Sequence, residues 1–153
     1  MTNDEILSRM KEQGRSDALN LRARAKDLDG TAIIAEESKV PRFDPEKDYS
    51  DWAVGSPVWE EVDGERQVFG LLQPHNASYY PGSTPSNTRA LWSLKHTKDQ
   101  AKAKPWVAPL GTSGMYMTDE VCKYSDKLWR SKQDNNPYEP GAIGTDNFWE
   151  VVS

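Results

Sequence analysis

The apolar residues of the first thirty positions recur mostly at steps of three and four, which is the spacing of one helix face. This pattern predicts a helix from residue 3 to about residue 28, opened by a capping box of Thr2 and Glu5 and stopped at Asp29-Gly30. Gly14 weakens its middle by about 1 kcal/mol relative to alanine. The narrow apolar stripe consists of Leu7, Met10, Ala18, Leu21, Ala25 and Leu28.

This helix has too little apolar surface to be stable alone, so it needs a partner. The partner is the rest of its own chain, other copies of the helix, or another protein. Leu7, Leu21 and Leu28 repeat at 14- and 7-residue steps, and heptad spacing favours a seam between helices. We therefore expect residues 1–40 to act in oligomerisation or docking through these three leucines. A homo-oligomer is expected, with a trimer favoured.

Beyond residue 42 the pattern changes to short β-prone runs separated by turns, and all 15 aromatic residues lie there. Residues 55–62 and 66–73 are predicted as two strands on either side of Asp63-Gly64, which is a strong hairpin signal. A short last strand carries Trp92. Residues 31–35 form a further β-prone segment.

The same order recurs nearer the C-terminus, where residues 120–124 and 128–133 flank a turn and Trp149 ends the copy. Glutamine, a turn with Tyr, Pro and Gly, and a terminal tryptophan follow one another in both copies. An internal repeat indicates that one structural unit is used twice. The predicted fold class is mainly β with an N-terminal α-helix, and it contains two small three-stranded antiparallel β modules in tandem.

The first module is predicted over residues 41–94 and the second over 105–153. Residues 95–104 between them are rich in lysine and are predicted as a solvated linker. Modules this small depend on large aromatic side chains for a core. Phe69 and Trp129 are expected at equivalent strand positions, and Trp92 and Trp149 are expected to close each sheet. The predicted structural core is thus Phe69, Trp92, Trp129 and Trp149.

The second copy resembles the chitin-binding type 3 fold, the small carbohydrate-binding modules of families 5 and 12. The matching residues are Asp119-Glu120-Val121, Tyr124, Lys127 to Lys132, Glu139-Pro140-Gly141 and Trp149-Glu150. The first copy is a more divergent match. The whole layout is also similar to small proteins encoded beside tail genes in phages and prophages of Gram-positive bacteria, on Gln73-Pro74-His75 and Lys104-Pro105-Trp106.

Sugar-binding members of that family carry exposed aromatic rings directly after the central strand. Gln73, Pro74, Gln133 and Asp134 stand at those places here, and none of them can stack on a sugar face. We therefore expect weak glycan binding at most. The remaining candidates for a glycan or protein contact surface are Trp52, Tyr79, Tyr80 and Tyr138. The alternative role for these four residues is packing within turns.

The charge balance is 19 basic against 24 acidic residues, a net charge of −5, which lacks the basic footprint of a nucleic-acid-binding protein. No apolar run approaches the roughly 20 residues of a membrane span. The single cysteine, Cys122, allows no internal disulfide and suits a reducing compartment. The charged N-terminus has no signal-peptide core, so we expect synthesis in a host cytoplasm.

Candidate chemistry is sparse. His75, His96 and Cys122 do not have metal-ligand spacing, and Cys122 beside Val121 in a strand is expected to be a buried, inert thiol. Neighbouring acids such as Glu60-Glu61 point to opposite faces of a strand, which is poor geometry for a catalytic pair. We expect no catalytic residues, no metal, no cofactor and no enzymatic activity.

Together these features predict a non-enzymatic structural protein of a phage or phage-like particle, most simply tail-associated and located in the virion. Its partners would be other virion proteins and a cell-surface polysaccharide, with no nucleic acid and no membrane. One alternative is a capsid decoration or head-fibre protein. Another is an accessory glycan-binding module for a separate cell-wall hydrolase.

Overall fold

The computed structural model describes residues 2–152, and its N-terminal part is helical as predicted. Helix α1 spans Asn3–Arg24 and continues as a 3-10 turn, η1, over Ala25–Asp27, so the helical segment ends close to residue 28. The capping box is present. The Glu5 amide donates to the Thr2 hydroxyl and the Thr2 amide donates to the Glu5 carboxylate, each at 3.1 Å.

The segment 31–35 was predicted as β-prone but lies in the short helix α2 (Gly30–Ala35). The Asp29 carboxylate caps this helix by accepting the Ala32 amide at 2.9 Å. Ile33 and Ile34 are fully buried on its inner face. A helix cap and complete burial outweigh a weak local β propensity. A further 3-10 turn, η2, follows over Glu37–Lys39.

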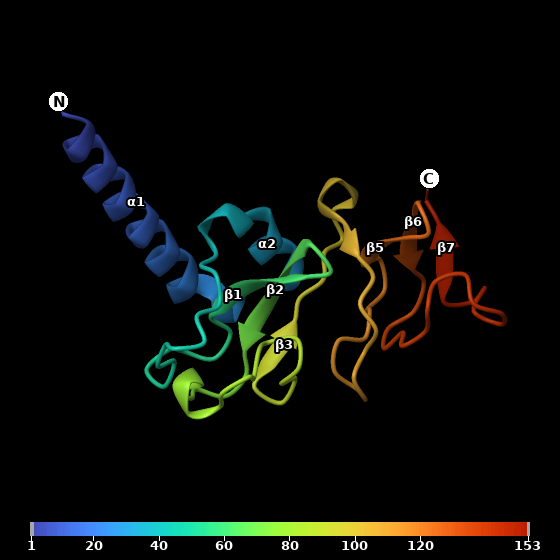
Figure 1. Ribbon diagram of the computed structural model, residues 1–153. Coiled ribbons are helices and arrows are strands. Elements are labelled where there is room, and N and C mark those ends of the chain that lie inside the picture. The colour runs from blue at the N-terminus through green and yellow to red at the C-terminus, as the bar shows by residue number, and fades with distance from the viewer. Residues whose placement is uncertain (1, 153) are drawn as a thin grey trace.

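Only the last turns of α1 pack on the rest of the chain, and its N-terminal half projects away from it (Figure 1). Residues 2–16 are all exposed, with Leu7 at 54% and Met10 at 64%. Leu21 is fully buried in its own chain, and Leu28 packs against the same cluster. Of the three leucines predicted to form a seam, two are thus covered by the chain's own later segments.

The first sheet contains three antiparallel strands in the order β1 (Pro57–Val62), β2 (Glu65–Leu71) and β3 (Trp92–Leu94). Asp63 and Gly64 form the predicted hairpin turn, with φ angles of 53° and 82°. Two positive φ angles match the right-handed twist of the flanking strands, which is why Asp-Gly is favoured there. The loop before β3 contains one 3-10 turn, η3 (Ala77–Tyr79).

The second sheet has four strands where three were predicted. In order they are β4 (Lys104–Pro105), β5 (Val121–Tyr124), β6 (Lys127–Ser131) and β7 (Trp149–Val151), preceded by a 3-10 turn, η4 (Gln100–Lys102). The antiparallel strands β5, β6 and β7 are the predicted ones, and β4 joins β5 in parallel. The coarse fold class, mainly β with an N-terminal helix, is confirmed.

The additional strand has a counterpart in the first sheet. The Trp106 amide donates to the Lys123 carbonyl at 2.9 Å beside β5, and the Phe43 amide donates to the Trp59 carbonyl at 2.8 Å beside β1. Arg42 forms a parallel bridge with Trp59 that is too short to count as a strand. In both modules, the segment that leads into the module therefore pairs in parallel with the first strand of the hairpin, β1 or β5.

The central strands carry their aromatic residues at the same register. In each sheet, the aromatic residue of the central strand pairs with the residue that comes two positions after the closing tryptophan. The pairs are Phe69 with Leu94, two residues after Trp92, and Trp129 with Val151, two residues after Trp149.

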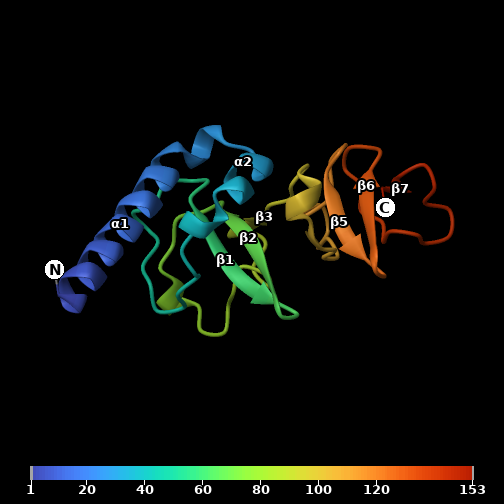
Figure 2. The ribbon, with the colours of Figure 1, turned by 90° about the horizontal axis from the view of Figure 1, so that it is seen from above.

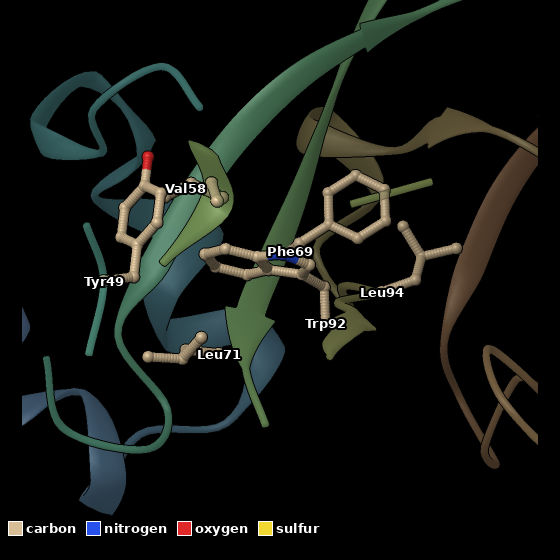
Figure 3. Close-up of a cluster of buried hydrophobic side chains, with 7 residues drawn as sticks. Tyr49, Val58, Phe69, Leu71, Trp92 and Leu94 are labelled. Atoms are coloured by element: carbon tan, nitrogen blue, oxygen red, sulfur yellow. The ribbon is translucent and has the colours of Figure 1, made fainter. Parts of the chain in front are cut away.

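The core is divided into three clusters. The largest lies on one face of the first sheet, where the Trp92 ring meets the Tyr49 ring edge-on at 5.2 Å. Phe69 and Leu71 belong to the same cluster (Figure 3). A second cluster joins α1 and α2 to the opposite face of β2. The third is in the second module, where Trp149 packs edge-on against Tyr116 at 5.2 Å and Trp129 is partly buried.

The segment between the sheets is only partly the solvated linker that its lysines predicted, because residues 98–102 are exposed but the residues before them are packed. His96 and Thr97 are buried, and the Val121 amide donates to the Thr97 carbonyl at 2.8 Å. Gly30 at the start of α2 lies so close to this segment that a Cβ atom there would be 2.2 Å from the His96 carbonyl oxygen. The Gln67 side chain also donates to the Pro105 carbonyl at 3.1 Å. Figure 2 shows the two sheets side by side, joined through this segment.

Candidate functional site

The recurring glutamines have a structural role in their loops. The Gln73 side chain donates to the Ala90 carbonyl at 3.0 Å, and the Gln133 side chain donates to the Asn147 carbonyl at 2.8 Å. Each bond ties the end of the central strand to the segment just before the closing tryptophan. Both side chains are held by these bonds and neither has a flat ring, so neither loop offers a stacking platform here.

The three predicted contact tyrosines lie in equivalent loops of the two modules, and all are exposed. Tyr79 is the most exposed, at 78%. Gly82 and Gly141 have φ angles of 80° and 78° and occupy matching turns, which pairs Tyr79 with Tyr138.

Two of these tyrosine rings, Tyr80 and Tyr138, are each held by contact with another aromatic ring. Tyr80 meets the His75 ring edge-on at 5.9 Å, and Tyr138 meets Phe148 in the same way at 4.6 Å. The backbone carbonyl of Tyr138 accepts the indole N–H of Trp149 at 2.8 Å. The Tyr138 loop is thus anchored to its closing strand, and all three tyrosines keep a ring surface open to solvent.

Trp52 belongs to a different surface. It is partly buried against Tyr49, and the Arg22 guanidinium of α1 lies 4.0 Å from the centre of its ring. Its indole lines a cleft of about 410 Å³ between α1 and the first module. One acid, Asp44, and four cations also line this cleft, namely Arg15, Arg22, Arg42 and Lys47.

A larger cleft, of about 520 Å³, lies where the two modules meet. Arg89 from the first module and Lys95, directly after that module, line it together with Glu120 from the second and Asp29 from the cap of α2. Burial lowers the pKa of Lys95 and raises the pKa of Glu120. Sequence reasoning missed this cleft, because its charged residues are up to 91 positions apart and converge only in the folded chain.

The groups with the most reactive side chains are buried and passive. Burial raises the pKa of the Cys122 thiol to about 12, so at neutral pH it is a thiol and not a thiolate. The His96 ring is stacked on Tyr116 at 3.6 Å and bonded to the Gly114 carbonyl, and burial lowers its pKa to about 4. Across residues 2–152, no three His, Cys, Asp or Glu side chains are grouped to hold a metal ion.

No helix within residues 2–152 is long and apolar enough to cross a membrane. No protein-family model matches the chain, and no curated protein matches its sequence.

Proposed function

We propose that this protein is a non-enzymatic structural component of a phage or phage-like particle, tail-associated, which displays two carbohydrate-binding-like modules. The observation that carries the proposal is the combination of a projecting helix with a duplicated module. Residues 2–16 of α1 are all exposed, and they include Ile6, Leu7 and Met10. Isolated helices of about this length are marginal in water, so a partner is needed to stabilise this one.

The partner of α1 is another virion protein or further copies of the same helix. The cleft beside Trp52 extends this attachment surface, because Arg15 and Arg22 of α1 line it. None of its four cations forms an ion pair with another described residue, although the chain carries a net charge of −5. An acidic surface on the particle would therefore complement it.

The two modules support the outward-facing part of the proposal. They repeat the same hairpin, the same glutamine bond and the same closing tryptophan, which is the plan that the carbohydrate-binding resemblance implies. Tyr79, Tyr80 and Tyr138 supply the exposed rings. Several weak sites on one particle can exceed single-site affinity by about 10²–10⁴.

Purified particles from cells that make this protein test the proposal. Quantitative mass spectrometry should find it in several copies per particle, and labelling should place it on the tail. Label on heads would support the capsid decoration or head-fibre alternative. Absence from particles, together with co-purification with a cell-wall hydrolase, would support the accessory-module alternative and overturn the proposal.

The same particles test the tyrosine loops. Particles that carry Tyr79→Ala and Tyr138→Ala should adsorb to cells more slowly, while the protein remains incorporated at the same copy number. The control is Leu110→Ala, which removes an exposed apolar side chain outside these loops. Unchanged adsorption would show that the tyrosines do not form the contact surface.

A further inference from the structure

The cleft between the modules contains a buried cation with unused hydrogen-bonding groups. Arg89 is only 9% exposed and forms no ion pair within residues 2–152. Its Nε donates to the Ser86 carbonyl at 2.9 Å, and its Nη1 is enclosed without a hydrogen-bond partner. A guanidinium has five N–H donors, and the two on Nη1 have no partner among the described residues.

Arg89 has no direct carboxylate contact among the described residues. Glu60 is close enough to influence it electrostatically, but both of its carboxylate oxygens accept hydrogen bonds from Ser86, at 3.0 and 3.1 Å. A buried charge without a partner is costly, and a carboxylate is the group that a guanidinium fork matches best. An incoming carboxylate would supply what the chain itself does not.

Lys95 is a second cation of this cleft, and it forms no direct ion pair within residues 2–152. Glu120 and Asp29 are close enough to favour its charged form. Its side chain lies across Gly70 of β2, where an added Cβ atom would be 2.7 Å from the Lys95 Cε. The second module has Arg130 at the matching place, opposite Glu150 as Gly70 is opposite Ser93. Glycine at this position therefore leaves room for the Lys95 stem in the first module.

The remaining groups of the cleft indicate what carries the carboxylate. Asp29 and Glu120 each accept a backbone amide, from Ala32 and from Met117, on one carboxylate oxygen, which leaves the other oxygen for a hydroxyl or amide donor. Leu72 and Met117 provide apolar surface. Binding sites combine an apolar lining with a few convergent polar groups, occur preferentially at domain boundaries and have volumes of about 300–1,000 Å³. A hydroxylated ring that bears one carboxylate satisfies the acids, the apolar surface and the two cations together.

We propose that this cleft binds a carboxylated sugar, with its carboxylate facing Arg89 and Lys95 and its hydroxyls donating to Asp29 and Glu120. This inference deepens the proposed glycan contact by giving it a chemical class and a second location. It concerns the isolated protein and does not depend on assembly into a particle. Failure of one proposal is therefore distinguishable from failure of the other.

NMR titration of the full chain with sodium glucuronate, glucose and sodium acetate tests the proposal. Glucuronate should shift the amide signals of residues 93–96 and 112–120 and bind at least about tenfold more tightly than glucose or acetate. Glucose lacks the carboxylate and acetate lacks the ring. Loss of one charged hydrogen bond alone weakens binding by about tenfold or more. Equal binding of glucose or of acetate overturns the proposal. The absence of any amide shift at about 20 mM glucuronate, roughly twenty times a millimolar Kd, also overturns it.

Three variants locate the site. Arg89→Gln should weaken glucuronate binding by about tenfold or more. Because Arg89 is buried, Lys95→Gln and Gly70→Ala provide a second reading, since the first removes the ammonium and the second displaces it. The control, Arg66→Gln, removes an exposed cation of β2 outside the cleft. Binding that survives all three cleft variants, or that is lost equally in the control, rules out this site.

Discussion

At the scale of single residues, matched positions in the two modules perform matched tasks. Trp92 and Trp149 close their sheets, and each is met edge-on by a tyrosine, Tyr49 or Tyr116, at 5.2 Å. Phe69 is fully buried, whereas Trp129 in the same register is only partly buried. The second module therefore depends more heavily on its closing tryptophan than the first module does.

Truncating Trp149 should strongly destabilise the second module. Its ring is buried and its indole N–H is bonded to the Tyr138 carbonyl, so Trp149→Ala removes both packing and a hydrogen bond. Urea unfolding should show a loss of about 3–5 kcal/mol. Tyr138→Ala is the control, because this exposed ring should cost less than about 1 kcal/mol. A loss below about 1 kcal/mol for Trp149→Ala would contradict its place in the core.

Isolated polar residues also decide local structure at this scale. Asp29 caps α2 and so converts a β-prone stretch into a helix. Gly30 then allows that helix to touch the His96 carbonyl, which no side chain at this position would permit without a shift of the backbone. Two adjacent residues thus bring α2 against the segment between the modules.

At the scale of elements, α1 has two halves with different surroundings. Its last turns bury Leu21 against α2 and β2, whereas residues 2–16 are exposed. Removal of all residues up to 30 would therefore destroy part of the core. Removal of residues 2–16 takes away only the projecting half.

We expect the projecting half to hold the protein in an oligomer. Light scattering should show an oligomer for the full chain and a folded monomer after deletion of residues 2–16. Replacing Ile6, Leu7 and Met10 with serine should have the same effect, because it removes the exposed apolar side chains. The control is Lys11→Ser on the same half. An unchanged oligomer after the deletion would show that the modules make the contacts.

The strands follow a simpler rule at this scale. Each hairpin has two residues with positive φ in its turn, Asp63-Gly64 and Ser125-Asp126, so the turn sets the register. The parallel edge pairing of β4 could not be anticipated from local pattern. Only two residues take part in β4, and proline is one of them.

At the scale of the whole molecule, His96 couples the two modules to pH. Its ring is buried on Tyr116, and desolvation, with smaller contributions from Arg89 and Lys95, holds its pKa at about 4 against an ordinary value of 6.5. In the unfolded chain His96 takes up a proton below pH 6.5, whereas in the folded chain it does so only near pH 4. Stability from neutral His96 is therefore complete above pH 6.5 and is lost as the pH falls toward 4.

Urea unfolding at pH 7 and pH 5 should reveal a loss at the lower pH, up to the order of 2 kcal/mol over this range. His96→Gln keeps a donor near the Gly114 carbonyl and should flatten this dependence. The comparison is needed because burial raises the pKa of Glu120, which favours folding at lower pH and acts in the opposite direction. An identical pH dependence in His96→Gln would contradict the role of His96.

The sequence alone determined the local elements of this protein. A capping box, an apolar stripe and two turn signals placed α1 and both hairpins, because these depend on residues within four positions of one another. The repeated order of glutamine and closing tryptophan likewise predicted two related sheets. Tyr79, Tyr80 and Tyr138 were identified as candidates because they lie in loops, and they are exposed.

Tertiary structure decided everything that depends on contacts between distant segments. It covered Leu21, converted the linker into a packed junction and added β4 to the second sheet. It also brought Arg89 and Glu120 to one cleft. Burial, desolvation and the pairing of charges arise only where remote parts of the chain meet, and residue order along the chain does not specify which parts those are.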